Sequence, residues 1–158
     1  MSYKITGSGC YIPNVVQKND AFLGLSFLDN HGTKFDEDNE CIIDKFNSIT
    51  GIEERKYIPS ELKTSDIAHI AAQKAIEDAN VDPETLNYII VAHNFGDISG
   101  DSKQIDTLPS LASRVKAKLK IKNPKCVAYD ILFGCPGWVE GMIQAHAFIK
   151  AGMAKKCL

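Results

Sequence analysis

The chain has 158 residues, of which 44% are apolar, with 18 basic and 20 acidic side chains. This length and composition are typical of one soluble globular domain, and the near balance of charge argues against nucleic acid or an anionic membrane as the main partner. No apolar run approaches the length of a membrane span, and no secretory signal is found. The five cysteines form no CxxC pair and have no histidines at metal-ligand spacing, so we expect free thiols in a reducing cytoplasm and no metal site.

The first half of the chain predicts one strand, an exposed loop and two helices. Tyr3–Gly7 has the pattern of a short strand. Residues 29–40 are polar and acidic, which is typical of an exposed loop or an insertion. A short helix is predicted over 42–49, followed by an irregular or edge-strand segment over 52–58. Apolar residues at helical spacing then predict a second helix that begins after Thr64 and ends near Asn80.

The second half of the chain alternates between strands and helices. A continuous apolar run predicts a buried strand over 88–92, and the next strand is predicted over 126–131. Helical periodicity is found over about 109–119 and over 139–153. Residues 155–158 have the pattern of a strand that is just starting. This alternation predicts an α/β layered fold with a parallel or mixed sheet and helices on both faces. We expect the N-terminal strand to share this sheet.

Cys135 is the candidate nucleophile. It lies in Gly134-Cys135-Pro136-Gly137, between a predicted strand and a predicted helix, where a thiol meets a helix N-terminus. Unpaired N–H groups and the helix dipole favour the thiolate there. An inert buried cysteine is the commoner fate of a free thiol, but the flanking glycines allow a substrate to approach closely. In α/β sheets, ligands bind at the carboxyl ends of strands, and Cys135 follows such an end.

Five motifs together carry a resemblance to a known family. They are Gly7-Ser8-Gly9-Cys10-Tyr11-Ile12-Pro13, Thr50-Gly51-Ile52-Glu53-Glu54-Arg55, Ile89-Ile90-Val91-Ala92, Leu108-Pro109-Ser110 and the segment around Cys135. In this order and spacing they resemble the N-terminal half of 3-oxoacyl-acyl-carrier-protein synthase III, a thiolase-like condensing enzyme. The resemblance covers nearly the whole chain and implies a thiolase-like half domain over residues 1–158, with a loop insertion at about 29–40.

The resemblance implies an acyltransferase of fatty acid biosynthesis that works through an acyl-cysteine. Cys135 would accept an acyl group from a thioester and pass it to a carbanion made by decarboxylating malonyl-acyl-carrier-protein, which forms 3-oxoacyl-acyl-carrier-protein. In the family, the histidine and asparagine that stabilise the developing charge come from the second half of the fold, so we expect this chain alone to be inactive in condensation. The implied acyl donor is acyl-coenzyme A or an acylated acyl carrier protein, and no cofactor is expected. The implied partners are acyl carrier protein and a second copy in a homodimer.

Several positions depart from the family pattern or are expected to shape its pocket. The aromatic residue and the arginine that hold the coenzyme A adenine fall on Lys45 and Ile49, so a primer delivered on a carrier protein is an alternative to coenzyme A. Leu108 matches the aromatic residue that reaches across the dimer to line the partner's acyl tunnel. Phe133 and Trp138 are candidates for shaping the acyl pocket, with ordinary core packing as the alternative.

Other polar residues are weaker candidates. His93 and Asn94 follow the carboxyl end of the strand over 88–92 and are candidates for lining the pocket. The basic run from Arg114 to Lys125 is typical of a solvated helix face and loop, and the alternative is a docking surface for an acidic carrier protein.

Two other functions are carried as alternatives. Hydroxymethylglutaryl-coenzyme A synthase shares the fold but uses a glutamate at about the place of Asn94. Non-catalytic thiolase-like partner subunits lose the nucleophile, whereas this chain has Cys135.

Overall fold

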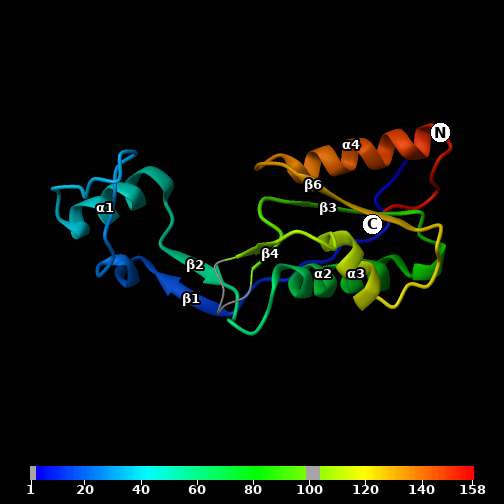
Figure 1. Cartoon of the computed structure of the whole chain (residues 1–158), viewed down its shortest axis with the longest axis horizontal. Coiled ribbons are helices and arrows are strands. Elements are labelled where there is room, and N and C mark those ends of the chain that lie inside the picture. Colours follow the sequence, from blue (N-terminus) through cyan, green and yellow to red (C-terminus); the bar gives the residue numbers. More distant parts are fainter. Residues whose placement is uncertain (1–2, 99–103) are drawn as a thin grey trace. The chain divides into compact units, whose positions relative to one another are not determined.

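The computed structural model describes residues 3–98 and 104–158, which divide into two compact units. The main unit comprises Met1–Tyr11 together with Ser60–Leu158, and the small unit comprises Ile12–Pro59. Figure 1 shows both units and labels the α-helices and most of the strands. Cys135 and the other predicted pocket residues all belong to the main unit.

A parallel pair of strands forms the centre of the main unit. β3 (Tyr88–His93) pairs with β6 (Val127–Leu132), and the register sets His93 opposite Leu132. Both strands therefore end at the same edge of the sheet, as the two apolar runs predict. Leu158 adds the start of a further strand, because its N–H donates to Tyr88 O at 2.9 Å and its carbonyl accepts from Ile90 N at 2.9 Å.

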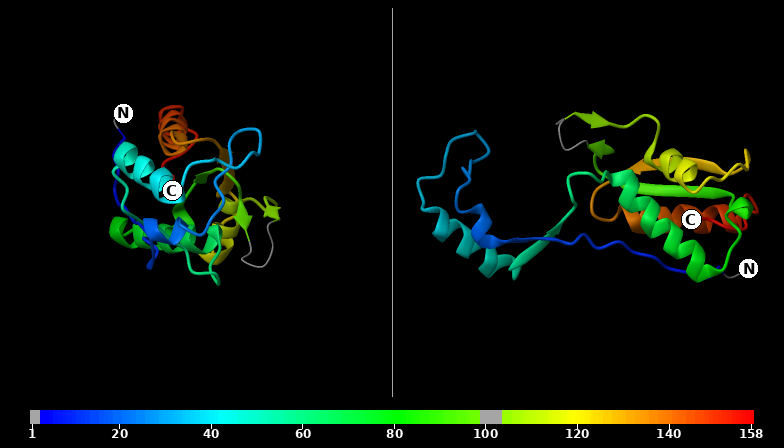
Figure 2. Two further views of the ribbon diagram at one scale, coloured as in Figure 1. Left: turned by 90° about the vertical axis from the view of Figure 1, so that its left-hand side faces the viewer. Right: turned by 90° about the horizontal axis from the view of Figure 1, so that it is seen from below.

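Helices cover both faces of this sheet, which confirms the layered α/β prediction. α2 (Thr64–Ala79) and α3 (Leu111–Lys118) lie on one face and α4 (Gly137–Lys150) lies on the other (Figures 1 and 2). A short 3-10 turn, η2 (Pro83–Thr85), precedes β3. The core between α2, α3 and the sheet consists of Ile76, Leu86, Ile89, Ala112, Val115, Ile121 and Cys126. Within the described residues, no helix is long and apolar enough to cross a membrane.

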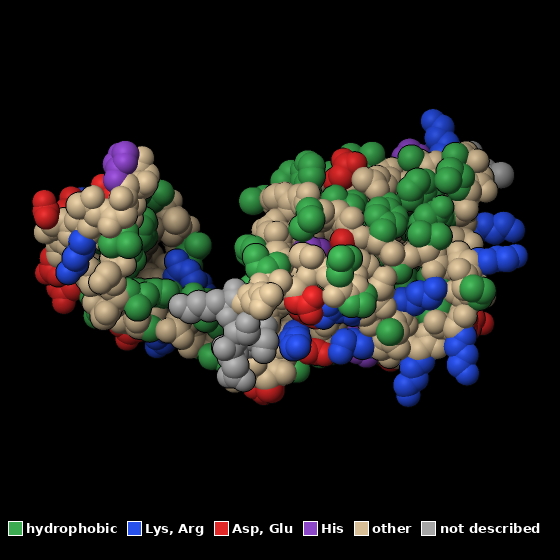
Figure 3. Space-filling view, in the orientation of Figure 1, with side chains coloured by type: hydrophobic (Ala, Val, Ile, Leu, Met, Phe, Trp, Pro, Cys, Tyr) green, Lys and Arg blue, Asp and Glu red, His purple; other side chains and the backbone are tan. Residues whose placement is uncertain are grey.

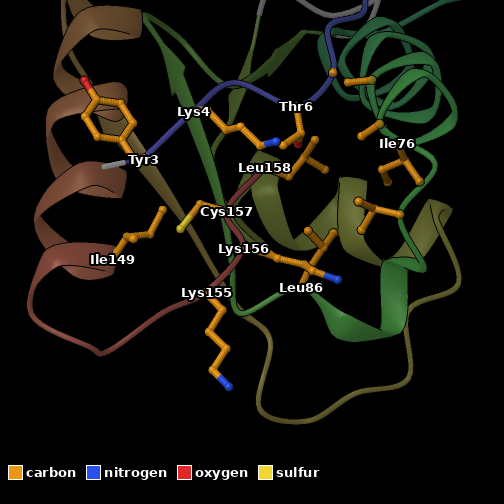
Figure 4. A pocket seen from close by; sticks show the side chains of 14 residues that line it. Tyr3, Lys4, Thr6, Ile76, Leu86, Ile149, Lys155, Lys156, Cys157 and Leu158 are labelled. Atoms are coloured by element: carbon orange, nitrogen blue, oxygen red, sulfur yellow. The ribbon is translucent and has the colours of Figure 1, made fainter. Parts of the chain in front are cut away.

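The N-terminal segment Tyr3–Gly7 is not a strand, so this prediction was wrong. The backbone that continues it lies tightly against α2, since a Cβ on Gly7 would be 2.5 Å from the backbone nitrogen of Ala79. A side chain of α2 also takes a backbone hydrogen bond that a strand partner would take, because Ser8 N donates to Asp78 Oδ2 at 2.8 Å. A cavity of about 350 Å³ is lined by this segment on one side and by Leu158 on another (Figure 4). Packing on the helix therefore replaces strand pairing.

A short antiparallel hairpin interrupts the connection between β3 and α3. β4 (Asp97–Ile98) pairs with β5 (Ile105–Asp106), and Asp97 lies opposite Asp106. Gly96 precedes β4 with a φ of 81°, and a Cβ there would lie 2.5 Å from the carbonyl oxygen of Asp106. Glycine is the residue that meets both conditions. Residues 99–103 of this connection lie outside the described residues.

The small unit consists of an antiparallel strand pair and one α-helix. β1 (Val15–Lys18) pairs with β2 (Glu54–Tyr57), and a 3-10 turn, η1 (Asn19–Phe22), follows β1. β1 was not predicted, whereas β2 falls in the predicted edge-strand segment. α1 (Asn39–Thr50) begins three residues before the predicted helix. The polar stretch before α1 is irregular, and the carboxylate of Asp29 organises a turn in it by accepting from the backbone N–H groups of His31 and Thr33.

Candidate active site

Cys135 lies in the turn that joins the carboxyl end of β6 to the start of α4, as predicted. Its side chain is exposed. Gly137 N donates to Gly134 O at 2.9 Å, which closes the turn around Cys135 and Pro136. α4 begins two residues after the cysteine, and the first N–H groups of an α-helix have no intrahelical acceptor. A sulfur here, and an oxyanion formed beside it, lies at the positive end of the helix dipole.

Close packing and one hydrogen bond hold α4 on the sheet. A Cβ on Gly137 would lie 3.1 Å from the Cβ of Ala92 and 3.3 Å from the Cβ of Phe133, so the helix starts directly against the end of β3. About two turns further on, Gln144 Oε1 accepts from the hydroxyl of Tyr129 on β6 at 2.6 Å. Burial raises the pKa of Tyr129, which keeps this hydroxyl a donor. These contacts fix Cys135 at the carboxyl edge of the sheet.

Asp130, which sequence reasoning did not select, connects the sheet to the start of α3. Its carboxylate accepts from the backbone N–H groups of Leu111 at 2.6 Å and Ala112 at 2.8 Å, the first two residues of α3. It also contacts His93 Nε2 at 2.9 Å, and its side chain is only 12% exposed. A signal was present in the sequence, because an aspartate inside an otherwise apolar strand is rare unless its charge is paired or hydrogen-bonded.

Both ring nitrogens of His93 take part in internal hydrogen bonds. Nδ1 accepts from Gly96 N at 2.9 Å, so Nε2 carries the hydrogen and donates to Asp130. The side chain is 7% exposed. This geometry favours a role in holding the turn between β3 and β4 over the predicted role in lining a pocket. Asn94, the next residue, is exposed at that turn.

The three apolar residues predicted to shape a pocket are exposed. Leu108, Phe133 and Trp138 are 82%, 46% and 69% exposed, so Phe133 and Trp138 are not core aromatics. Phe133 N donates to His93 O at 3.2 Å, which places it at the same sheet edge as Cys135. Trp138 instead lines a cavity of about 170 Å³ with Ile90 and other residues along the side of β3. Leu108 lies just before Ser110, the residue that caps α3.

The basic run extends from Arg114 on α3, which contacts Asp97 and Asp106 of the β4–β5 hairpin, to the lysines that precede the start of β6. It occupies α3 and the connection to the start of β6, and a strand of six residues is roughly 20 Å long. Two of its lysines have partners within the main unit: Lys116 Nζ donates to the carbonyl of Cys126 at 2.6 Å, and Lys118 pairs with Asp66 at 2.7 Å. The lysines after α3 are thus separated from Cys135 by the length of β6, and docking of a carrier protein on the run stays a prediction.

The small unit contains Lys45 and Ile49, the two positions on which the resemblance predicts that the adenine contacts fall. Lys45 Nζ lies 2.6 Å from Glu37 Oε2, and this hydrogen bond raises the pKa of Lys45. Ile49 is 79% exposed. Neither side chain has the aromatic face or the planar guanidinium that stacks on a purine ring.

Comparison with known proteins agrees with the resemblance that the motifs predict. Beta-ketoacyl-[acyl-carrier-protein] synthase III 1 of Vibrio parahaemolyticus is 33% identical over 158 residues, which is 100% of this chain and 43% of that protein. A synthase III from Neisseria meningitidis is 34% identical over 155 residues, covering 98% of this chain and 42% of that protein. The chain thus spans less than half the length of these curated relatives. No family model matches the chain.

Solved structures confirm the fold. The 3-oxoacyl-[acyl-carrier-protein] synthase III of Aquifex aeolicus superposes with a TM-score of 0.73 at 30% identity, covering 98% of this chain and 42% of that chain. OleA from Xanthomonas campestris superposes with a TM-score of 0.68 at 22% identity, which supports the fold alone. The chain therefore has the thiolase-like α/β fold and corresponds to the N-terminal part of synthase III relatives.

Proposed function

We propose that this chain is the nucleophile-bearing part of a condensing enzyme of the 3-oxoacyl-acyl-carrier-protein synthase III type. One observation carries the proposal. Cys135 is exposed in the turn between β6 and α4, at the carboxyl end of two parallel strands, in a fold that synthase III relatives share. A thiol at this edge is accessible to a substrate and has helix N–H groups beside it.

In the proposed first half-reaction, the Cys135 thiolate attacks the carbonyl carbon of an acyl thioester. A new carbon–sulfur bond forms and the carbonyl oxygen takes up the negative charge. When the tetrahedral species collapses, the carbon–sulfur bond to the carrier breaks, and the carrier leaves as a thiolate that is protonated by solvent. The N–H groups at the start of α4 are suited to stabilise the transient oxyanion. A Cβ on Gly134 would meet nothing within 4 Å, so the space beside the cysteine is open to the substrate.

In the proposed second half-reaction, decarboxylation of malonyl-acyl-carrier-protein supplies the carbanion that takes the acyl group from Cys135. This step needs donors for the enolate oxygen. Two histidines near the sheet are engaged elsewhere, since His93 bonds to Asp130 and Gly96, and His146 stacks on Tyr3 at 4.2 Å. Their engagement supports our proposal that condensation needs further residues, of the kind that the longer relatives carry outside the region matched by this chain. The proposed product is 3-oxoacyl-acyl-carrier-protein.

Mass spectrometry of the full chain after incubation with an acyl thioester tests the proposal. Acetyl-coenzyme A and an acetylated carrier protein are offered in separate reactions, and we expect one acyl adduct on Cys135 that is absent in C135A. C41A is the matched control, because Cys41 is also exposed but lies in α1 of the small unit. An adduct that persists in C135A contradicts the assignment of the nucleophile. No adduct with either donor favours a non-catalytic thiolase-like partner.

A further inference from the structure

One carboxylate lies in the first turn of the helix that follows Cys135. The sequence from Cys135 to Gln144 contains a single charged residue, Glu140, and this residue belongs to the first turn of α4. The dipole of a helix and its N–H groups without an acceptor attract a carboxylate to the N-terminus. The proposed reaction uses the same groups for the Cys135 thiolate and for the oxyanion. Glu140 therefore competes with the nucleophile for these donors unless its side chain is held elsewhere.

The N–H groups at the start of α4 are within the reach of a glutamate at position 140. Within the part of the chain that the structure describes, no acceptor contacts the N–H of Trp138 or Val139. The N–H of Gly137 donates at 2.9 Å to a carbonyl of the turn that contains Cys135. In a capping box, a glutamate in the first turn reaches back about three residues, and Gly137 is three residues before Glu140. A free Glu140 carboxylate would thus bring its charge to the end of the helix beside Cys135.

Gln144 holds the Glu140 carboxylate away from that end. Gln144 Nε2 donates to Glu140 Oε1 at 3.1 Å, and Gln144 lies about one turn nearer the C-terminus of α4. Gln144 Oε1 accepts from the hydroxyl of Tyr129 on β6 at 2.6 Å. A carboxylate only accepts hydrogen bonds, so the amide nitrogen faces Glu140 and the amide oxygen is left to face the tyrosine. The hydroxyl on β6 therefore fixes the orientation of the amide that holds the carboxylate.

The cluster around Tyr129 contains one carboxylate. The titratable groups whose charges act on Tyr129 are those of Cys157, Tyr88 and Glu140. Burial raises the pKa of Tyr129 and of Cys157, so this hydroxyl and this thiol keep their protons at pH 7. The side chains of Glu140 and Gln144 are half-buried, and a partly buried charge is screened less by salt than an exposed one. The direction in which Glu140 points therefore affects the charge balance at the start of α4.

We propose that Tyr129 and Gln144 are positioning residues that hold the Glu140 carboxylate away from the start of α4 and so leave the helix N–H groups to Cys135. The proposal rests on the proposed function, because it takes Cys135 as the nucleophile. Loss of the Gln144 amide frees the carboxylate, and loss of the tyrosine hydroxyl frees the amide to turn. In either case a negative charge moves towards the sulfur, and a like charge disfavours the thiolate.

The pH dependence of Cys135 alkylation by iodoacetamide tests the positioning without any acyl substrate. Mass spectrometry of the full chain after digestion follows the peptide that contains Cys135. In Q144A and Y129F, we expect the midpoint of the rate profile to lie about half a pH unit above that of the wild type, which makes alkylation below the midpoint about threefold slower. Y129F keeps the aromatic ring and removes only the hydroxyl, so it decides the outcome if Q144A does not fold. An unchanged midpoint in both variants overturns the proposal.

Substitution of Glu140 separates this role from a purely structural one. E140Q removes the charge, so the double variant E140Q/Q144A should have the midpoint of the wild type or a lower one. A midpoint that stays high in the double variant means that Gln144 acts only on the structure of the helix, and this overturns the proposal. A raised midpoint in E140Q alone also overturns it, because Glu140 would then promote the thiolate. Q73A is the matched control and should leave the midpoint unchanged, since Gln73 Nε2 donates to Glu77 Oε1 at 2.7 Å on α2.

The rate of Cys135 acylation at pH 7 tests the connection to the proposed function. The donor is acetyl-coenzyme A or the acetylated carrier protein, whichever acylates the wild type. We expect acylation of Q144A to be about threefold slower than that of the wild type and E140Q/Q144A to regain the wild-type rate. Equal acylation rates with a shifted alkylation profile overturn the role in acyl transfer alone. A wild-type chain that neither donor acylates overturns the proposed function, whereas the alkylation profile still decides whether Gln144 positions Glu140.

Discussion

Removal of the Asp130 carboxylate should destabilise the main unit far more than the loss of an ordinary helix cap. In D130A, the N–H groups of Leu111 and Ala112 and the Nε2–H of His93 all lose their acceptor. Leu111 and Ala112 are both 0% exposed, so water does not easily replace the carboxylate. A hydrogen bond to a charged group contributes about 1.5–3 kcal/mol, and bonds that share one acceptor are not additive. We therefore expect D130A to lower the free energy of unfolding by about 3–5 kcal/mol, a large part of the 5–15 kcal/mol typical of a domain.

A second variant separates the charge from the shape of the side chain. D130N keeps the size of the side chain and one acceptor oxygen, but its amide nitrogen then faces one of the three donors. We expect D130N to lower the free energy of unfolding by about 2–3 kcal/mol, which is less than the decrease in D130A.

Urea unfolding at pH 7, followed by far-ultraviolet circular dichroism, measures these differences. D82A is the matched control, because Asp82 caps the exposed turn η2 through a single bond from Glu84 N at 2.9 Å. Its expected cost is about 0.5–1 kcal/mol. If D130A is destabilised no more than D82A, the three bonds to Asp130 do not hold the sheet and α3 together, and our account of the site's framework is wrong.

Three further outcomes are expected. G137A should slow acylation of Cys135, because the new methyl group lies 3.1 Å from the Cβ of Ala92 at the end of β3 and displaces the start of α4. In G134A the new methyl group meets nothing within 4 Å, so stability and acylation rate should stay nearly unchanged. Equal acylation rates in the two variants would refute this reasoning. A hydrogen bond from Lys118 lowers the pKa of Asp66, so the stabilisation from this pair is complete above the pKa of the unfolded carboxyl and is lost as the pH falls through the lower folded pKa. D66N should remove this acid-dependent stabilisation, which is about 0.5 kcal/mol for a partly exposed pair. Urea unfolding of both proteins from about pH 5 to about pH 2 measures the difference. Light scattering should find the chain as a dimer or a larger species, because exposed apolar surface favours association. Val139 and Ile143 on α4 are 51% and 56% exposed, and apolar side chains gather over that helix in Figure 3. A stable monomer would contradict this expectation.

The local pattern of the sequence was sufficient for the strands and helices that carry Cys135. The run at 88–92 is apolar throughout and the run at 126–131 is apolar apart from Asp130. Such runs are typical of strands that are covered on both faces in a parallel sheet. The helix after the cysteine follows from apolar residues at helical spacing. The placement of Cys135 in a strand-to-helix turn required only the order of these elements along the chain, and order is what a sequence records.

Tertiary packing determined the structure of a segment that could either pair with the sheet or pack on a helix. Tyr3–Gly7 has the composition of a strand, but the glycines that follow let its backbone approach α2 closely, and a side chain of that helix takes a hydrogen bond from Ser8. No pattern within five residues distinguishes a strand that pairs with a sheet from one that lies on a helix. The difference depends on which surface the rest of the chain brings to it.

The hydrogen bonds and ion pairs around the site also became visible only in the folded structure. His93 bonds to Asp130, 37 positions away, and Arg114 joins Asp97 and Asp106 across a hairpin that the sequence did not predict. The sequence places the basic run on one helix and the loop after it, but only the folded chain shows that Arg114 pairs with the hairpin while the last lysines precede the start of β6, the end opposite Cys135. Periodicity reports which face of an element is buried, because burial repeats with the geometry of the backbone. It carries no information on which donor meets which acceptor, because hydrogen bonds and ion pairs act over about 3–4 Å between residues that only the folded path of the chain brings together.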